Sequence, residues 1–235
     1  MRFLLLALAG LVACGPTNAV EWGKQSFSDR GLSTAASNSF SCATCHDLTP
    51  TSTLRPGYPL ADVSLRPSFW GGNVVTLRDA VDQCLVDFMK SKALSTTDDR
   101  GKALYLYLKT LLTTDGSLAG TQPLTIVKDI VDLPSGDAGR GAAIYSAGCA
   151  NCHGAVHTGA GRIGPDASIL PDDTIKSFGT DPVRGARVVT VEKIRHGKYF
   201  NIGGIMAPYS VERCSDAQVG DILAYLESMG LPPSP

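Results

Sequence analysis

The chain has 235 residues and a formal net charge of −1, and 43% of its residues are hydrophobic while 18% are charged. This composition is typical of a folded globular protein and excludes a disordered or fibrous one. The near-neutral charge gives no reason to expect nucleic acid as a partner. The length allows one large domain or two small ones.

The N-terminus predicts an export signal. Arg2 precedes the apolar stretch FLLLALAGLVA, which is too short to span a bilayer but suits the core of a signal peptide. The stretch ends in LVAC at residues 11–14, which resembles the processing box of bacterial lipoproteins, where the cysteine becomes the lipidated first residue. Cleavage after Ala19 is the alternative. In either case we expect an exported protein in which residues 1–19 form the signal segment and a short tether.

Lipidation of Cys14 would anchor the protein to a membrane surface, because acyl chains on the cysteine insert into lipid. Gly15 rather than Asp follows the cysteine, which resembles the pattern of lipoproteins sent to the outer membrane of Gram-negative bacteria. We therefore expect a periplasmic protein held on a bacterial membrane, with the outer membrane favoured.

The rest of the chain contains one pattern twice. CATCH at residues 42–46 recurs as CANCH at 149–153. A glycine followed four residues later by an aromatic residue precedes each motif, and a helical stretch ending in Tyr-Leu follows each. These landmarks are Gly23, Phe27, Tyr107 and Leu108 in the first copy, and Gly141, Tyr145, Tyr225 and Leu226 in the second. They predict a tandem duplication of one small helical unit.

We place the two domains and their connection at residues 20–118, 136–235 and 119–135. The apolar middle of the connection, Leu124 to Val127, predicts an extended strap that lies on a domain rather than a free linker. Ser135 or Asp137 can cap the first helix of domain two. Each domain has about a hundred residues, which is small for a self-sufficient core. A large apolar cofactor would make up that deficit.

Each C-x-x-C-H motif predicts a covalently attached haem c. Two thiols three residues apart lie on one side of a helical turn and can bond to the two haem vinyl groups, and the next His can coordinate the iron. A zinc site would need four ligands and no His directly after the second Cys. A thioredoxin-like motif would need strand–helix alternation, which is not seen here. The predicted cofactor-binding residues are Cys42, Cys45, His46, Cys149, Cys152 and His153, of which His46 and His153 bind iron.

With these landmarks the chain resembles the class I cytochrome c family over nearly all of its mature sequence. The resemblance implies an all-α fold of two tandem domains, each a few helices wrapped around a haem, in which the glycine lets the first helix cross the last one closely. Gly164-Pro165 resembles the family's Gly-Pro element, whose proline carbonyl orients the proximal His. In domain one, Pro56 and Pro59 are the candidates for that role. Domain one also carries an insertion, SDRGLSTAASNSFS, before CATCH.

The run GGIMAP at residues 203–208 resembles the family's distal-methionine loop, which implies that Met206 is the sixth ligand of the second iron. A thioether ligand favours ferrous iron and raises the reduction potential. Core packing is the alternative role for a lone methionine. His157 and His196 are the other candidates. His157 follows His153 too closely to reach the opposite face easily, and His196 lies one helix earlier, so we expect both to be structural or exposed to solvent.

The sixth ligand of the first iron is open between Met89 and Cys84. Met89 lies nearly as far before Tyr107 as Met206 lies before Tyr225, so the repeat favours Met89. However, Cys-x-x-x-x-Met before a helix resembles the first-haem segment of thiosulfate dehydrogenases, in which the cysteine can be the distal ligand. A thiolate would lower the potential and suit sulfur chemistry. An open or different sixth position is the third alternative.

Domain one also resembles the N-terminal haem domain of bacterial dihaem peroxidases. The residues that carry this likeness are Gly23-Lys24, Phe27, Asp29, Leu32-Ser33, CATCH, FWGG at 69–72 and Thr76-Leu77. Those enzymes are longer, and their second domain differs. We expect Phe69 and Trp70 to pack on the haem or to cap the core. Cys214 is expected to be structural, and it can pair with Cys84 in a disulfide if Met89 is the ligand.

Together these features predict an exported dihaem cytochrome c that passes electrons between other redox proteins. The alternative is a dihaem oxidoreductase in which the first haem is catalytic, with Cys84 as its ligand, and the second relays electrons. In the favoured version that enzyme would oxidise thiosulfate, and in the less favoured version it would reduce peroxide. Only for such an enzyme is a small-molecule substrate expected. An enzyme needs an iron with an exchangeable or unusual ligand, whereas a carrier keeps both irons saturated. The ligand of the first haem therefore separates the two functions.

Overall fold

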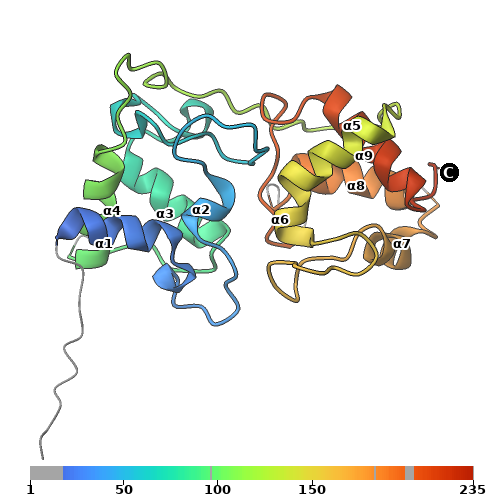
Figure 1. Ribbon diagram of the computed structural model, residues 1–235, viewed down its shortest axis with the longest axis horizontal. Coiled ribbons are helices and arrows are strands. Elements are labelled where there is room, and N and C mark those ends of the chain that lie inside the picture. Colours follow the sequence, from blue (N-terminus) through green and yellow to red (C-terminus); the bar gives the residue numbers. More distant parts are fainter. Residues whose placement is uncertain (1–17, 96, 183, 199–203, 235) are drawn as a thin grey trace, which may run out of the picture.

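The computed structural model describes residues 18–95, 97–182, 184–198 and 204–234. Figure 1 shows two helical lobes side by side, which correspond to domain one and domain two. Within the described ranges the only β pairing is an isolated bridge between Phe69 and Val74, so the predicted all-α class is confirmed. No helix in these ranges is both long and apolar enough to cross a bilayer. The signal segment with Cys14 lies outside the described residues.

The helices of domain one surround the CATCH motif. They are α1 (Ala19–Ser28), α2 (Cys42–Cys45), α3 (Leu77–Asp87) and α4 (Asp99–Lys109), with 3-10 turns η1 (Arg30–Leu32), η2 (Val63–Leu65) and η3 (Trp70–Gly72). The side chains of Asn18, Thr76 and Asp98 accept hydrogen bonds from backbone N–H groups in the first turns of α1, α3 and α4. These caps satisfy donors that have no partner inside the helix, which explains where the three helices begin.

Domain two repeats the arrangement with longer helices near its C-terminus. Its elements are α5 (Ala138–Ile144), the π-helical turn η4 (Tyr145–Cys149), α6 (Ala150–His153), α7 (Asp172–Phe178), α8 (Gly185–His196) and α9 (Asp216–Ser228). Asp137, one of the two predicted caps, accepts a hydrogen bond from the backbone of Arg140. Ser215 and Gln218 form a capping box at the start of α9. The π turn η4 leads directly into CANCH, and such turns are frequent at functional sites.

The first and last helices of each domain cross at a glycine, as the resemblance implied. A side chain on Gly23 of α1 would overlap the carbonyl oxygen of Ala103 in α4 and lie 2.7 Å from Cβ of Tyr107. A side chain on Gly141 of α5 would likewise overlap the carbonyl of Asp221 in α9 and lie 2.8 Å from Cβ of Tyr225. The paired aromatic rings are also repeated, with centroids 5.9 Å apart for Phe27–Tyr107 and 5.4 Å apart for Tyr145–Tyr225.

Each domain has its own hydrophobic core. The first core includes Leu85, Met89, Leu104 and Leu108, and the second includes Val219, Leu223, Leu226 and Cys214. Cys84 and Cys214 are both free thiols in different domains, so the disulfide considered between them is not formed. Cys214 is instead a small buried residue of the second core, next to the start of α9.

Residues 119–135 cross from the first lobe to the second without a helix (Figure 1). The beginning of this strap covers domain one, since Pro123 and Leu124 line its central cavity. Its remainder lies on domain two, where Thr125 accepts a hydrogen bond from Val211 at 3.2 Å and the carbonyl of Val127 contacts Nε2 of His196 at 2.6 Å. The strap therefore touches both domains.

Candidate haem sites

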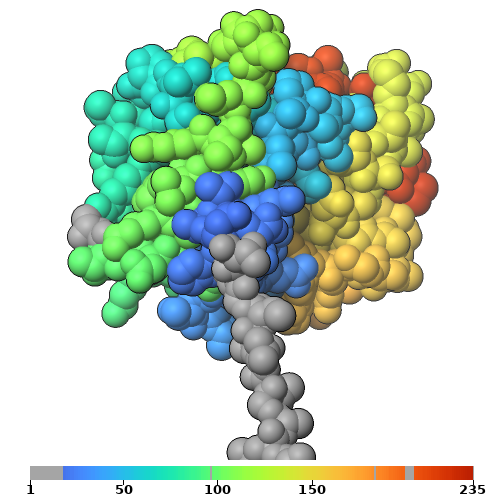
Figure 2. Space-filling model, turned by 60° about the vertical axis from the view of Figure 1, so that its left-hand side comes forward, coloured from blue at the N-terminus to red at the C-terminus, as the bar shows by residue number. Residues whose placement is uncertain are grey.

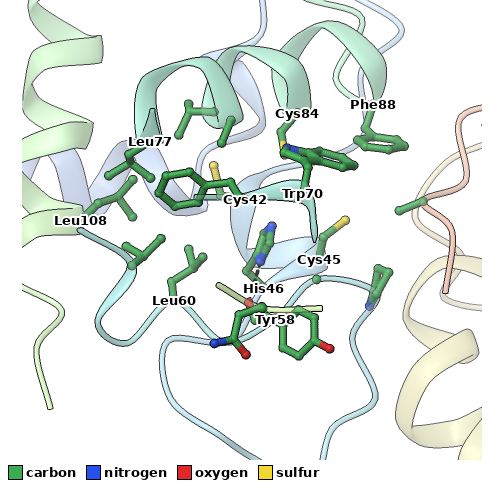
Figure 3. Close-up of a pocket in the computed structure, with 18 of the residues that line it drawn as sticks. Cys42, Cys45, His46, Tyr58, Leu60, Trp70, Leu77, Cys84, Phe88 and Leu108 are labelled. Atoms are coloured by element: carbon green, nitrogen blue, oxygen red, sulfur yellow. Dashed lines mark hydrogen bonds between the residues drawn. The ribbon is translucent and has the colours of Figure 1, made fainter. Parts of the chain in front are cut away.

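A cavity lies inside domain one beside CATCH (Figure 3). Helices α2, α3 and α4, the turn η3 and the loop around residues 56–60 form its walls, and residues 122–124 of the strap also line it. Most of its lining is aliphatic or aromatic, for example Leu60, Val63, Leu77, Leu85, Leu104 and Leu108. Phe69 and Trp70 also line it, as expected, and Trp70 stacks on Phe88 with ring centroids 6.1 Å apart. An apolar planar group would complete this core.

The side chains of Cys42, Cys45 and His46 all reach this cavity, with the two thiols on either side of the imidazole (Figure 3). Helix α2 is a single turn, which brings both cysteines to one side. Burial raises the pKa of Cys42 to about 11 and that of Cys45 to about 12. Both are therefore neutral thiols near neutral pH.

The imidazole of His46 is oriented by the backbone. Its Nδ1 lies 2.8 Å from the carbonyl oxygen of Tyr58, to which it donates a hydrogen bond as a neutral ring (Figure 3). Burial, with help from the charges of Arg66 and Arg213, lowers the pKa of His46, so the ring is neutral. Nε2 then keeps its lone pair for a metal, and a hydrogen bond on the other nitrogen is the usual support of a metal-binding histidine.

Gly57 lets the loop pass close to the imidazole of His46 in this orientation. A side chain at Gly57 would overlap the imidazole ring, so only glycine lets the loop approach so closely. The carbonyl that holds the ring belongs to Tyr58, so the expectation that Pro56 or Pro59 plays this part is wrong.

In domain two the ring of His153 is held in the same way. Its Nδ1 lies 2.8 Å from the carbonyl oxygen of Ser168, and burial lowers its pKa. The carbonyl of Pro165 does not take this part, which corrects the expectation from the Gly-Pro element. The chain turns after Gly164, where Ala167 donates to the Gly164 carbonyl, and this turn brings Ser168 to the ring.

The two cysteines of CANCH are buried thiols as well. Burial raises the pKa of Cys149 to about 12 and also raises the pKa of Cys152. Tyr145, at the start of η4, donates from its hydroxyl to the carbonyl of Gly154 at 2.9 Å. This bond ties the residue after His153 back to the helix before the motif. The sequence marks Tyr145 only as the aromatic residue that follows Gly141 in the repeat, and it gives no signal for this hydrogen bond.

Both candidate distal ligands of domain one lie on the wall of its cavity. Cys84 projects from α3 on the side opposite His46 (Figure 3). Burial raises the pKa of the Cys84 thiol, and the nearby Cys42 and Cys45 add to this effect. Met89 follows the end of α3, is buried in the first core, and accepts at its carbonyl a 2.6 Å hydrogen bond from Ser33. The choice between Met89 and Cys84 stays a prediction.

Met206 is half-buried and packs against the core of domain two. Its carbonyl accepts a 2.9 Å hydrogen bond from the backbone of Lys198, while Gly203 of the same loop lies outside the described residues. The neighbouring Ala207 and Pro208 line the cavity of domain one instead. One loop therefore contacts both the core of domain two and the cavity of domain one. Ligation of iron by Met206 stays a prediction.

The two competing histidines have other partners. Nδ1 of His157 lies 3.2 Å from the carboxylate of Asp172 on the surface. His196 is buried at the end of α8, and its ring contacts the carbonyl of Val127 in the strap. Both positions agree with the structural or solvent-facing roles expected for these residues.

The two domains meet at the loop that follows CATCH. Tyr209 donates from its hydroxyl to the carbonyls of Leu54 and Gly148, at 3.3 and 3.4 Å, and so joins the two domains. Arg213 donates to the carbonyl of Arg55 at 3.1 Å. In Figure 2 the light-blue surface of the segment after CATCH borders the yellow surface of domain two. None of these contacts has a signal in the sequence, because they join residues far apart in the chain.

The second cysteine of each motif lies at this interface. Cys152 packs against the core of domain one. Its thiol is also close enough to Cys45 to add to the effect of burial on the pKa of Cys45. The guanidinium of Arg55 acts on both thiols and lowers their pKa values, against the effect of burial. CATCH and CANCH therefore face each other across the domain boundary.

Comparison with known proteins agrees with this site. Residues 136–226, less than half of the chain, match the family model of cytochrome c oxidase, cbb3-type, subunit III. No curated protein matches. A solved structure, the thiosulfate dehydrogenase TsdBA from Marichromatium purpuratum in its as-isolated form, is similar with 19% identity and a TM-score of 0.42. The alignment covers 89% of this chain but 45% of that one, so this chain spans less than half of that protein.

The family match shows a cytochrome c domain in the second half of the chain, which confirms the resemblance predicted from CANCH and its neighbouring helices. Covalently bound haem c is therefore a cofactor of this protein, and electron transfer is its general role.

Proposed function

We propose that this electron-transfer haem protein is an exported dihaem c-type cytochrome that carries electrons between redox partners in the periplasm or at a membrane surface. The observation that carries the proposal is the repeated support of the proximal histidine. Nδ1 of His46 and Nδ1 of His153 each meet a backbone carbonyl at 2.8 Å, and burial keeps both rings neutral. Because both imidazoles are oriented by a backbone carbonyl and are neutral, both can bind iron, and this supports two haems.

The residues present in domain one fit a haem c. Two neutral thiols stand beside an oriented imidazole, and Gly57 leaves the ring the space that any side chain would fill. Aliphatic and aromatic side chains form most of the rest of the wall and exclude water there. Bound haem would supply a one-electron iron couple. The chain would contribute the thioether attachment, the axial ligands and the apolar surroundings that set the potential.

The domain interface favours electron transfer within one chain. Cys45 and Cys152, the second attachment cysteine of each motif, lie near each other, and Cys152 packs on the core of domain one. The attachment sites of the two cofactors are thus on facing edges of the domains. Hydrogen bonds from Tyr209 and Arg213 hold those edges together.

The wall opposite His46 favours a carrier over an enzyme. Apart from Cys84, the residues that α3 contributes to the cavity are apolar. Arg66 is the only cationic side chain that lines the cavity within the described ranges, and it belongs to the segment that follows His46 and Tyr58. An anionic substrate such as thiosulfate would need cationic or hydrogen-bonding groups beside the reacting position. In line with the repeat, we propose His/Met ligation at both irons, by His46 with Met89 and by His153 with Met206.

Counting the haems of paired variants tests this proposal. The wild-type protein is expected to carry two haems per chain, by haemochrome absorbance and by mass. Replacement of Cys42 and Cys45 by Ala should remove one, and replacement of Cys149 and Cys152 by Ala should remove the other. Cys214→Ala is the control, because Cys214 is a buried cysteine that belongs to neither C-x-x-C-H motif, and it should keep both haems. A wild-type protein with one haem would contradict the dihaem proposal.

The position of Cys84 supports the second candidate, a haem oxidoreductase with catalytic haem one and haem two as relay. A cysteine opposite His46 is placed to coordinate the same iron. The test is turnover of thiosulfate, and separately of peroxide, by the purified holoprotein. Turnover that is lost in Cys84→Ala but kept in Cys214→Ala would establish the enzyme. If neither substrate is turned over by the wild type, the carrier remains.

The location is proposed from Cys14, which lies outside the described residues. We propose a lipid anchor at this cysteine on a bacterial membrane, with the outer membrane favoured. Cys14→Ser should move the holoprotein from the membrane fraction to the soluble periplasmic fraction. A variant that stays with the membrane would show that the anchor is something other than lipid on Cys14.

A further inference from the structure

Two adjacent residues of the loop after CATCH, Leu54 and Arg55, contact both attachment motifs. On the side of domain two, a side chain on Gly148, directly before CANCH, would lie 3.0 Å from the carbonyl oxygen of Leu54. On the side of domain one, Nη1 of Arg55 donates a 3.1 Å hydrogen bond to the carbonyl of Thr44, inside CATCH. The side chain of Arg55 therefore lies where the two motifs approach each other.

Domain two holds this part of the loop in place. Tyr209 donates from its hydroxyl to the carbonyl of Leu54 at 3.3 Å, and Nε of Arg213 donates to the carbonyl of Arg55 at 3.1 Å. The side chain of Arg55 is 20% exposed, so little water surrounds its charge. Because its backbone is fixed at the domain boundary, the guanidinium is also confined to that boundary.

The charge of Arg55 is only partly offset by a carboxylate. Nε of Arg55 lies 3.6 Å from Oδ1 of Asp47, which is too long for a hydrogen bond. This Nε is buried and has no hydrogen-bond partner among the described residues. Oδ2 of Asp47 instead accepts hydrogen bonds from the hydroxyls of Thr51 and Thr53, at 2.8 and 3.1 Å. The two charges form a loose pair, so the positive charge of Arg55 still acts on its surroundings.

The surroundings of Arg55 include the second attachment cysteine of each motif. Cys152 packs on the core of domain one, and the charge of Arg55 acts on Cys152 as well as on Cys45. These two cysteines would carry the facing edges of the two haems. When an iron takes up an electron, its haem becomes more negative by one charge, and a fixed cation nearby favours this form. One guanidinium is therefore placed to favour the ferrous form of both haems.

We infer that Arg55 is an electrostatic determinant shared by the two haems, which raises the reduction potential of both and favours the chain that holds two electrons. The inference rests on the proposed function, because it assumes a haem on each motif. Each ferric iron takes up one electron from a redox partner, so the fully reduced chain holds two. A cation beside one haem would change one potential, whereas a cation between the motifs changes both in the same direction.

The first test is a redox titration of the holoprotein in which the two haems are followed separately. Arg55→Gln should lower the ferrous/ferric ratio of both haems by about tenfold, or about 59 mV for one electron. Arg55→Lys keeps the charge and should return most of both shifts. Arg100→Gln is the matched control and should leave both potentials unchanged. Arg100 also pairs with a carboxylate and donates to a backbone carbonyl in domain one, but in the segment after α1 rather than at the domain boundary. Unchanged potentials in Arg55→Gln, or a shift confined to one haem, would overturn the inference.

A second variant tests the same charge pair from its other side, in case Arg55→Gln fails to fold. Asp47→Asn keeps an acceptor for the two threonine hydroxyls but removes the negative charge beside Arg55. It should therefore raise both potentials, and a potential that stays unchanged or falls at either haem would also overturn the inference. Peptide mapping by mass separates this failure from that of the proposed function. A chain without haem on residues 42–46 or 149–153 contradicts the dihaem cytochrome itself, whereas two haems without the paired shift contradict only this inference.

Discussion

Domain one and domain two agree at the histidine side of the site and differ at the opposite side. His46 and His153 are each held at 2.8 Å by a backbone carbonyl, and each domain crosses its first and last helices at a glycine. Across from His46 stands helix α3 with Cys84, followed at once by Met89. In domain two the helix before the candidate distal ligand is α8, and Met206 follows it in the chain.

This difference between the domains distinguishes the residues that attach a haem from the residues that determine its chemistry. Attachment needs two thiols, an oriented imidazole and a close helix crossing, and these are the features that both domains retain. The distal segment decides the sixth ligand and hence the potential and the access of substrates. It is also where the domains are coupled, since Ala207 and Pro208 beside Met206 line the cavity of domain one.

The largest effect on stability is expected from substitutions that disrupt the helix crossing shared by both domains. Gly141→Ala should destabilise the protein by about 3 kcal/mol or more, because the new methyl group overlaps the Asp221 carbonyl and the backbone must shift. Gly23→Ala should cost a similar amount in domain one, where it overlaps the Ala103 carbonyl. Free energies of unfolding of the two holoproteins measure this.

Gly139→Ala in the same helix α5 is the control for that pair. Gly139 is exposed, and a methyl group there would contact only the Asp137 side chain at 3.3 Å. Alanine should therefore leave stability unchanged or raise it by up to about 1 kcal/mol through its helix propensity. A Gly141→Ala variant as stable as Gly139→Ala would show that the crossing is not needed.

The next largest effect is expected when the candidate distal ligands of the two domains are replaced. If Met206 is the sixth ligand of a second iron, as proposed, Met206→Ala should convert that iron from low-spin to high-spin. It should also lower the potential, because a thioether that favours ferrous iron would be lost. Met89→Ala should do the same for the first iron if the repeat extends to the ligands. Visible and resonance Raman spectra of each oxidised variant report the change. A first haem unaltered in Met89→Ala but altered in Cys84→Ala would assign the cysteine as its ligand.

A smaller effect is expected at the interface between the domains. Tyr209→Phe removes the hydroxyl that donates to Leu54 in domain one and to Gly148 in domain two. The loss of one hydrogen-bonding group should cost about 1 kcal/mol. It should also make the two domains unfold more independently in calorimetry. Unchanged stability together with unchanged cooperativity would show that other contacts hold the interface.

The smallest expected effect is the pH dependence of the stability that the contact between Glu212 and the strap provides. Glu212 accepts hydrogen bonds from the backbone and hydroxyl of Thr125. Burial acts to raise the pKa of Glu212, but these hydrogen bonds outweigh it and lower the pKa to about 2, from 4.5. Because the folded-state pKa is depressed, its contribution to stability is present above about pH 4.5 and is lost as the pH falls towards 2.

The melting temperature as a function of pH measures that contribution. Glu212→Gln should melt below the wild type at neutral pH, and the gap should narrow between pH 4.5 and 2. Since Glu212 is exposed to solvent, the gap should be small and should shrink in high salt. A gap that stays constant across this range would contradict a role for the ionised carboxylate.

Much of this fold was predictable from local patterns. The attachment motifs, the paired glycines and the cap at Asp137 depend on residues a few positions apart, whose spacing shows in the sequence. The contacts that join distant segments were not predictable in this way. The carbonyl of Ser168, rather than that of Pro165, holds His153 because a turn after Gly164 decides which carbonyl reaches the ring.

The position of Arg66 in the cavity is a second feature that the sequence does not predict. Its place in the cavity depends on carbonyls of Pro59 and Ala61 nearby, and of Leu118 far along the chain. Nothing in the residues around it distinguishes it from a surface arginine. The same holds for Ala207 and Pro208, which follow a loop of domain two but line the cavity of domain one.

The dihaem carrier is tested most directly by electron paramagnetic resonance of the oxidised full-length holoprotein, with quantification of each signal. We predict two low-spin ferric signals of equal intensity, one for each haem, and no high-spin signal. One low-spin signal per chain would contradict the second haem. A high-spin signal from half of the iron would contradict the carrier, because it would reveal a haem with an open coordination position.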